Sequence, residues 1–483
     1  MHSVIASHRG GPCRRILVSS ILLGLLAGSL LRAGEPSNYE GPWAIVTQIE
    51  QRMAEPQFPD RDFPVADFGA AGDGERDDSQ AIKAAIEACH EAGGGRVYVG
   101  PGNYITGPVH LKSNVNLHLA EGATLLFKTD PDAYLPQVYT RWEGVECMNY
   151  SPLVYAMGQE NIAITGKGTL DGRADDTNWW PWKGKTEFGW EKGDPEQTPA
   201  RDRLIAMADE GIPVEERIFG NGDYLRPNFI QPYRCRNVLI EGVTILRSPM
   251  WEVHPVLCRN VTVRGITVVS HGPNNDGCNP ESCQDVLIED CVFDTGDDCI
   301  AIKSGRNTDG RRVAVAAENI IVRNCQMRDG HGGVVIGSEI SGGCRNVFVE
   351  NCVMDSPNLD RAIRIKTNSV RGGLIDGVYV RNVMIGQVAE TVFKVNFLYE
   401  EGAGHGFNPV VQNVYFENVR SRESRFPFYI IGYEDSPVRN LHFKDCRFEG
   451  VKEPSVIRHV ENMVLDNVII GKEAPMDEWG GMQ

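Results

Sequence analysis

Much of the chain repeats one short pattern of apolar and polar positions. A turn-forming residue is followed by an apolar residue, any residue, an apolar residue and a charged residue, as in the stretch from Asn237 to Glu241. Asn, Asp or Gly begins each copy, and these residues tolerate the left-handed backbone region better than others. Nine copies begin 22 to 36 residues apart, at Asn237, Asn260, Asp285, Asn319, Asn346, Gly377, Asn413, Asn440 and Asn462. Asn114 and Asn161 begin weaker copies, and stacked Asn side chains are expected to form a hydrogen-bonded ladder.

A repeat of this length, with two or three short strands in each copy, is typical of a right-handed parallel β-helix. We therefore predict an all-β, single-stranded β-helix of about ten coils. A capping helix is expected near the N-terminus, from Asp77 to about Ala92, because apolar residues there recur at helical spacing and Gly93 to Gly95 follow. Short strands are expected around it, at residues 63–74, 96–99, 104–106, 115–119, 124–127 and 162–164.

The chain contains thirteen cysteines. Eight of them occupy repeat positions that hold Val or Ile in other copies, which predicts small buried apolar residues rather than disulfides. These are Cys235, Cys258, Cys283, Cys291, Cys325, Cys344, Cys352 and Cys446. Pairing of Cys278 with Cys283, or of Cys89 with Cys147, is left open.

The two ends of the chain differ from the repeat. Residues 1–33 combine arginines, an apolar run and a terminal Ala33, which predicts a signal peptide; the run is short for a membrane span. We expect a mature protein that is secreted, periplasmic or held at the cell surface, without stable membrane insertion. The predicted order is a connector or short helix at 34–62, the β-helix domain at 63–470 and a tail at 471–483.

The formal net charge of −17 argues against nucleic-acid binding through bulk charge. An anionic ligand would therefore need a local cluster of basic residues. One long segment, residues 172–221, interrupts the β-helix domain without repeating, and it carries Trp179, Trp180, Trp182 and Trp190. Long structured insertions are usually functional. We interpret the tryptophans as a carbohydrate-stacking rim at the cleft, with an outer cap as the alternative.

Polar residues that break the apolar pattern recur in one segment of successive copies. Two adjacent carboxylates, Asp297 and Asp298, follow Gly296 at the entrance of a predicted strand. The neighbouring copies place other polar or aromatic residues at similar offsets: Trp251, His254, Asp276, His331, Arg364, Lys366 and Lys394. In a β-helix such residues should form one strip. Both adjacent aspartates can reach it only if the backbone bends at Gly296, because consecutive strand residues point to opposite faces.

Three carboxylates beside basic residues suit two reactions. In hydrolysis, one Asp protonates a glycosidic oxygen, another activates water, and Arg and Lys bind a sugar carboxylate. In β-elimination, the aspartates bind Ca²⁺ while Arg or Lys removes a proton. A β-helix can support either reaction, so the fold does not decide between them.

Four motifs occur in a fixed order: Asn274 to Gly277, Gly296 to Asp298, Gly330 to Gly332, and Arg364 to Lys366. Together they resemble the signature motifs of glycoside hydrolase family 28, the polygalacturonase family. The resemblance implies an inverting hydrolase without a metal or other cofactor. It implies Asp297 as general acid, Asp276 and Asp298 as activators of water, and His331 as support for the acid. It also implies Arg364 and Lys366 as ligands of the galacturonate carboxylate, with Asn274 shaping the site.

We add Lys394 and Trp251 as expected substrate contacts, from their places in the strip. Asn275 and Asn279 depart from the family pattern, where Thr and, in bacterial relatives, Asp are common. The expected function is hydrolysis of α-1,4-linked galacturonic acid in pectin, and we hypothesise that the insertion favours exo action by closing one end of the cleft. The alternatives are a rhamnogalacturonan or other decorated-pectin hydrolase, a pectate lyase and a non-catalytic carbohydrate-binding β-helix.

Overall fold

The computed structural model describes residues 41–472. The predicted signal peptide and almost all of the predicted tail lie outside these residues. Within the described range, no helix combines the length and the apolar character that crossing a membrane requires.

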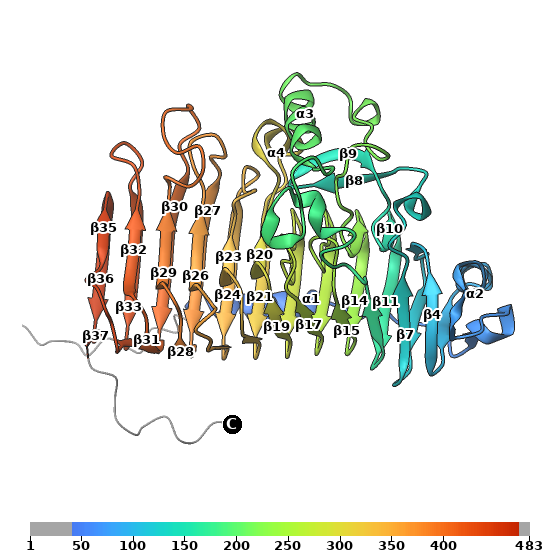
Figure 1. The fold of residues 1–483 in the computed structure, drawn as a ribbon. Helices are drawn as coiled ribbons and strands as arrows, with labels where there is room; N and C mark the ends of the chain where they lie inside the picture. The colour runs from blue at the N-terminus through green and yellow to red at the C-terminus, as the bar shows by residue number, and fades with distance from the viewer. Residues whose placement is uncertain (1–40, 473–483) are drawn as a thin grey trace, which may run out of the picture. The chain divides into compact units, whose positions relative to one another are not determined.

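The described residues form a right-handed parallel β-helix whose coils stack along one axis (Figure 1). Two sheets run the length of the stack with thirteen strands each, more than the ten coils expected. The first sheet contains β1 (Asp62–Pro64), β3 (Gly95–Val99), β6 (Val115–Leu119), β11 (Glu160–Gly166), β14 (Arg236–Glu241), β16 (Arg259–Arg264), β18 (Gln284–Glu289), β21 (Ala317–Arg323), β24 (Cys344–Glu350), β27 (Leu374–Arg381), β30 (Val410–Glu417), β33 (Val438–Lys444) and β36 (Val460–Asp466).

The second long sheet follows the first across the turn of each coil. It contains β2 (Asp73–Asp77), β4 (Gly102–Thr106), β7 (Ala123–Phe127), β12 (Thr169–Asp171), β15 (Thr244–Leu246), β17 (Thr267–Ser270), β19 (Val292–Thr295), β22 (Gln326–Met327), β25 (Val353–Met354), β28 (Met384–Gln387), β31 (Arg420–Glu423), β34 (Arg447–Phe448) and β37 (Ile469–Ile470).

The third face carries the polar strip. Its six-stranded part contains β20 (Asp298–Ile302), β23 (Gly332–Ile336), β26 (Arg361–Lys366), β29 (Thr391–Asn396), β32 (Phe426–Ile431) and β35 (Val456–Arg458). A three-stranded part joins β5 (Val109–His110), β10 (Val154–Met157) and β13 (Ile230–Tyr233). Single bridges from Ile230 to Val253, to Cys278 and to Ile300 connect the two parts. This face is therefore continuous along the stack.

The predicted turn residues adopt the expected backbone. All eleven, from Asn114 to Asn462, have positive φ between 51° and 81°. Their side chains form a ladder in which an Asn amide donates to the side-chain oxygen of the turn residue on the preceding coil. Asn319 Nδ2 donates to Asp285 Oδ1 at 2.9 Å, and Asn346 Nδ2 donates to Asn319 Oδ1 at 3.0 Å. Gly377 has no side chain, so on its coil the carboxylate of the neighbouring Asp376 accepts the hydrogen bond from the Asn413 amide. The ladder is thus confirmed.

The twelve described cysteines are buried and free. The eight assigned to aliphatic positions lie in one continuous core with Val, Ile, Leu and Phe from the coils. The two pairings that the sequence left open are not formed, since Cys89, Cys147, Cys278 and Cys283 are all free thiols.

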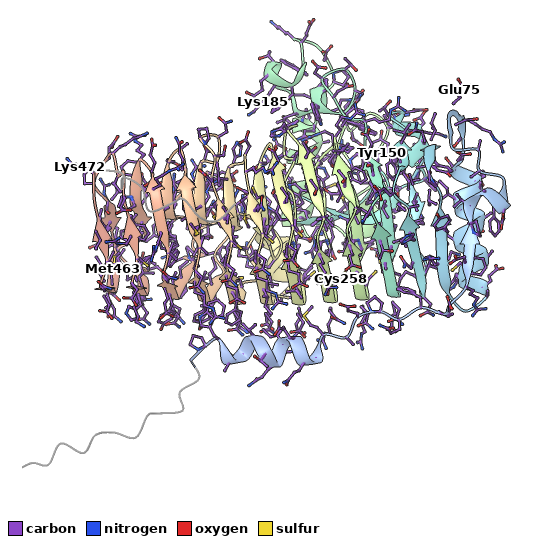
Figure 2. All side chains as sticks on the ribbon, turned by 90° about the horizontal axis from the view of Figure 1, so that it is seen from below. Glu75, Tyr150, Lys185, Cys258, Met463 and Lys472 are labelled. Atoms are coloured by element: carbon purple, nitrogen blue, oxygen red, sulfur yellow. The ribbon has the colours of Figure 1, made fainter. Side chains whose placement is uncertain are left out.

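Two helices cover parts of the stack. The predicted capping helix is α2 (Ser79–Glu91), which buries Ile82, Ala85, Ile86 and Cys89 against the first coils. The expected connector contains α1 (Ala44–Arg52), which lies along the outer surface of the first sheet (Figure 2). There Val46 and Ile49 pack against Leu287, Ile321 and Phe348.

Above the third face, the insertion gathers with a hairpin and two short helices (Figure 1). The hairpin pairs β8 (Val138–Trp142) with β9 (Val145–Asn149), and the helices are α3 (Thr198–Asp209) and α4 (Asn307–Val313). The tryptophan interpretation is wrong: Trp179 is buried, and its ring packs edge-on against Tyr134 and Trp182. Trp182 packs in turn on Tyr150 and Tyr224, so these aromatics hold the insertion together.

Candidate active site

The predicted strip forms because the third face keeps its strands in register. Asp298 at the start of β20 pairs with Gly332 at the start of β23, which puts His331 beside Asp297. The backbone amide of His331 donates to the Asp297 carbonyl at 3.0 Å. On the next coils Arg364 pairs with Val335 and then with Lys394.

Asp276, Asp297 and Asp298 converge, and one carboxylate oxygen of each lies within 4.8 Å of the others. Gly296 permits this approach through its small size, since a Cβ there would lie 2.6 Å from the Gly272 carbonyl oxygen. Typical inverting enzymes separate their two carboxyl groups by roughly 6.5–9.5 Å. The nearest oxygens of this cluster lie closer together than that range.

Asp297 is the most accessible of the three carboxylates. Its side chain is 17% exposed, against 4% for Asp276 and none for Asp298. His331 Nδ1 lies 3.0 Å from Asp297 Oδ1, and the backbone amide of Asp298 donates to the same oxygen at 2.9 Å. Asp297 therefore faces the cleft with a fixed carboxylate.

The pKa values of Asp276 and Asp297 are shifted in opposite directions. Burial, and then the charge of Asp297, raise the pKa of Asp276 to about 8. Burial alone would raise the pKa of Asp297 too, but the hydrogen bond from His331 and nearby lysines lower it below its usual value. The same hydrogen bond raises the pKa of His331. These shifts favour a proton on Asp276 and an ion pair between Asp297 and His331.

Asp298 faces the cluster, as expected, but lies beneath the cleft surface. Lys366 Nζ donates to its Oδ2 at 2.6 Å, and an Arg364 nitrogen lies 3.8 Å from its Oδ1. The Tyr399 ring lies 5.5 Å from the Arg364 guanidinium and 5.6 Å from the Lys366 ammonium. The two cations expected to bind substrate are therefore already oriented by a buried carboxylate and an aromatic ring.

The other expected substrate contacts fare differently. Asn274 lines the cleft, and its Oδ1 accepts from Lys183 at 2.8 Å and from Arg226 at 2.9 Å. Trp251 also lines the cleft, under the Lys303 ammonium at 4.5 Å. Lys394 does not line this cleft: its ammonium binds Glu390 at 3.0 Å and lies over the Tyr429 ring.

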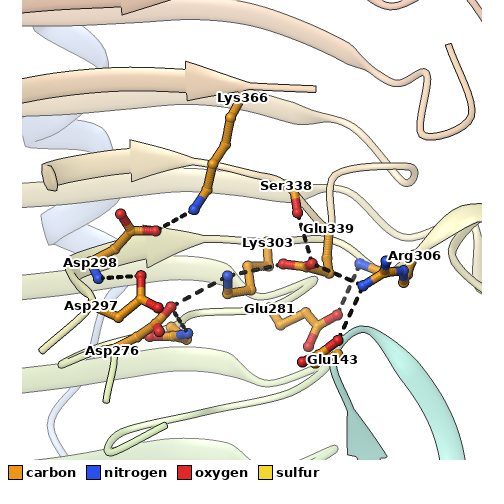
Figure 3. A network of polar contacts seen from close by, with 12 residues as sticks. Glu143, Asp276, Glu281, Asp297, Asp298, Lys303, Arg306, Ser338, Glu339 and Lys366 are labelled. Carbon is orange, nitrogen blue, oxygen red and sulfur yellow. Dashed lines mark hydrogen bonds and ion pairs between the residues drawn. The ribbon is translucent and has the colours of Figure 1, made fainter. Parts of the chain in front are cut away.

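Sequence reasoning missed a buried chain of charges behind Asp276 (Figure 3). Lys303 Nζ lies 3.5 Å from Asp276 Oδ2 and donates to Glu339 at 3.0 Å, and Arg306 continues the chain to Glu143. The signal was present in Lys303, a cation at the end of the apolar strand β20. Because buried Lys requires a partner, its position predicts a nearby carboxylate.

These residues line a cleft of about 670 Å³. Eight Lys and Arg side chains face it, against six Asp and Glu, although the whole chain carries a net charge of −17. The insertion contributes Lys183, Lys185 and Arg201. The cleft is therefore suited to an anionic ligand, as the sequence required.

Among residues 41–472, two groups of side chains have donors that suit a metal ion. Asp276, Asp297 and Asp298 form one, and there the Lys366 ammonium pairs with Asp298 and the Lys303 ammonium lies 3.5 Å from Asp276. His271, Asp294 and Asp329 form the other, and there His271 binds Asp294 at 2.9 Å.

Comparison with known proteins adds to this geometry. Residues 220–466 match the family model for glycosyl hydrolases family 28, and residues 63–120 match a model described as rhamnogalacturonase A/epimerase, pectate lyase-like. The chain is 29% identical to a probable polygalacturonase of Vitis vinifera, over 78% of this chain and 72% of the other. It is also 29% identical to an exo-poly-alpha-D-galacturonosidase of Dickeya chrysanthemi, over 70% of this chain and 58% of the other. The solved structure of a hyperthermoactive exopolygalacturonase from Thermotoga maritima superposes with a TM-score of 0.87, at 48% identity over 89% of this chain and 96% of that one.

Proposed function

Because the chain belongs to glycosyl hydrolases family 28, and is therefore a glycoside hydrolase, we propose that it removes galacturonic acid from the ends of α-1,4-linked polygalacturonate in pectin. The observation that carries the proposal is the cleft itself, in which three convergent carboxylates lie among basic side chains. Carboxylates supply the acid and base of glycoside hydrolysis, and Arg and Lys bind the uronate carboxyl groups. The predicted signal peptide supports export of the protein.

We assign Asp297 as the general acid, because it is the most exposed of the three carboxylates and contacts His331. The raised pKa of Asp276 favours the proton on that residue instead. The reactive arrangement forms when this proton moves from Asp276 to Asp297, whose nearest oxygens lie within 4.8 Å. Asp297 then protonates the leaving glycosidic oxygen, while ionised Asp276 removes a proton from the attacking water. His331 holds the acceptor oxygen of Asp297 in place.

Asp298 acts differently from the role that the family resemblance implies. It is covered, and its charge is matched by Lys366, so it orients Lys366 and Arg364 toward the substrate carboxylate. Its effect on the attacking water is electrostatic. Removing Asp298 should therefore weaken substrate binding as well as turnover.

The bond-forming step is proposed to invert the anomeric centre. The nearest carboxylate oxygens of the three aspartates lie closer together than is typical of inverting enzymes, so the stereochemistry is tested directly. Proton NMR during hydrolysis of trigalacturonate identifies the anomer that forms first. Initial β-galacturonate supports inversion, and initial α-galacturonate contradicts it.

Exo action is supported by the insertion, whose residues Lys183, Lys185 and Arg201 line the cleft. It is also supported by two of the similar proteins, which are named as enzymes that act on chain ends. The match to the rhamnogalacturonase-type model covers residues 63–120, which contribute no residue to the cleft lining. This match therefore does not favour a decorated-pectin substrate.

The hydrolytic reaction is tested by incubating polygalacturonate with the protein in the presence of a chelator. Hydrolysis releases reducing ends without unsaturated products. A near-ultraviolet absorbance that grows with time and disappears with chelator would indicate a lyase. No reducing ends at all would indicate a non-catalytic carbohydrate-binding protein.

A further inference from the structure

The tip of the β8–β9 hairpin places an acidic side chain, that of Glu143, in the cleft. The backbone conformation of this residue is one that glutamate rarely adopts. Glu143, at the hairpin tip, has φ of 42°, in the left-handed region that Gly and Asn adopt most readily. The next residue, Gly144, accepts a hydrogen bond from the Arg306 amide at 2.9 Å. A Cβ on Gly144 would lie 2.8 Å from the Arg306 nitrogen and 2.9 Å from the Glu339 Cβ. The tip is therefore fixed against the cleft wall.

Two arginines bind the Glu143 carboxylate. Its Oε2 accepts from Arg201 Nε at 2.7 Å and from Arg306 at 3.2 Å. Burial opposes ionisation, but the charges of Arg201, Arg306 and Lys183 hold the pKa of Glu143 below its usual value. The side chain is 10% exposed and lines the cleft. An ionised carboxylate thus occupies a cationic pocket inside a cleft for carboxylate-bearing sugars.

The cations around Glu143 come from separate parts of the chain. The fold therefore brings them together around this carboxylate. Arg201 lies on α3 and Lys183 on the 3₁₀ turn Trp180–Lys183, both in the insertion, whereas Arg306 precedes α4. Figure 3 places Glu143 and Arg306 at one end of the charge network and Asp297 and Asp298 at the other. In polygalacturonate every sugar carries a carboxylate. A further sugar on the hairpin side would therefore need free cations there, and Glu143 has already bound them.

Resting on the proposed activity, we propose that Glu143 is a specificity-determining residue. Its carboxylate fills the anion position formed by Arg201 and Arg306, and so excludes the carboxylate of a second galacturonate on this side of the catalytic aspartates. One sugar is then released at each cleavage. A neutral side chain at residue 143 removes this competing carboxylate from the two arginines, so that the carboxylate of a second sugar can approach them.

The test compares the first products from tetragalacturonate labelled at its reducing end. Wild type should release galacturonate, and Glu143→Gln should raise the initial ratio of digalacturonate to galacturonate at least tenfold. Glu210→Gln, an exposed glutamate at the end of α3, is the matched control and should keep the wild-type ratio. A ratio for Glu143→Gln within twofold of wild type would overturn the proposal.

A second variant separates this effect from misfolding. Asn tolerates the left-handed backbone better than Gln, so Glu143→Asn should fold and should also release digalacturonate. Thermal unfolding checks that both variants are native. If wild type is active and neither native variant changes the ratio, the assignment of Glu143 fails while the proposed function stands. If wild type releases no galacturonate, the proposed function itself fails.

Discussion

Two columns of polar side chains run along this β-helix, and they are built on opposite principles. The ladder from Asn114 to Asn462 uses Asn at most rungs, with Asp285 and Asp376 as acceptors, and its turn residues share the left-handed backbone region. The cleft strip uses charged residues that differ from coil to coil, with Asp276, Asp297, His331 and Arg364 in turn. The ladder satisfies its own hydrogen bonds, whereas the strip balances charge through partners behind it.

This difference separates the two roles: the ladder contributes to the stability of the fold, and the strip carries the reactive groups. An Asn rung can be repeated at little cost, because its side chain can donate to one neighbour and accept from the other. Buried charges cannot, since each requires a specific partner. The strip has these partners in Lys303, Lys366 and Glu339, and they leave Asp297 as the carboxylate that reaches the cleft. Variants in the two columns should therefore affect different properties.

The largest expected effect is that of Asp297→Asn. Losing the general acid should reduce kcat for polygalacturonate by about 10²–10⁴-fold. The side chains are almost the same size, so the midpoint of thermal unfolding should stay within a few degrees. Reducing-sugar release and a melting curve measure the two properties on one sample. Retained activity would remove Asp297 from its assigned role.

Lys366→Met should damage both properties, because Lys366 joins the strip to its buried partner. The covered carboxylate of Asp298 loses its ammonium, which should destabilise the fold by about 3–5 kcal/mol. Activity should also fall through a higher KM, as one ligand of the substrate carboxylate is lost. Adding Asp298→Asn should restore stability without restoring activity. A double variant as unstable as the single one would contradict this pairing.

Asn319→Ala should affect stability alone. The variant loses one donated and one accepted ladder bond and places alanine at φ of 59°. Together these changes should cost about 2–4 kcal/mol in free energy of unfolding, measured by denaturant titration. Asn319→Gly keeps the backbone freedom and should cost less. Equal losses in the two variants would show that the left-handed backbone contributes little.

The ladder and the strip could be predicted from the sequence because both follow the repeat. The copies fix their own register, so the offset of Asp276 or His331 from its turn residue places it on one face. The family resemblance then supplied roles that spacing alone left open. The stacked cysteines followed from the same register.

The parts outside the repeat could not be placed in this way. The tryptophans of the insertion were assigned to the cleft, but Trp179 packs on Tyr134, and Trp182 packs on Tyr150 and Tyr224, all of which lie outside the insertion. Glu143 and Arg201 reach the cleft from a hairpin and from the insertion, neither of which has a repeat register. The covering of Asp298 depends on Lys366, two coils away.

A separate effect concerns pH and Asp276. Its pKa is about 8 in the folded protein and near 3.8 when unfolded, so between these values the folded state binds more protons. This contribution therefore makes stability fall as pH rises from about 4 to 8, on the order of 1 kcal/mol per pH unit. Asp276→Asn should flatten that part of the profile and gain most over wild type at pH 8. Parallel profiles for the two proteins would contradict the raised pKa.

The smallest effect should be that of Lys394→Ala. The side chain is bound to Glu390 and does not line the cleft. Initial-rate kinetics on polygalacturonate should therefore give a KM within about twofold of wild type, as expected for an ion pair near the surface. A tenfold rise in KM would restore Lys394 as a substrate contact.

The central claim is that the strip hydrolyses polygalacturonate from its ends, one sugar at a time. The most direct test follows the products of wild type on long polygalacturonate from the first seconds, together with the viscosity of the solution. The account predicts saturated galacturonate from the start, with viscosity falling slowly as reducing ends accumulate. Early long oligomers with a rapid loss of viscosity, or unsaturated products, would contradict it.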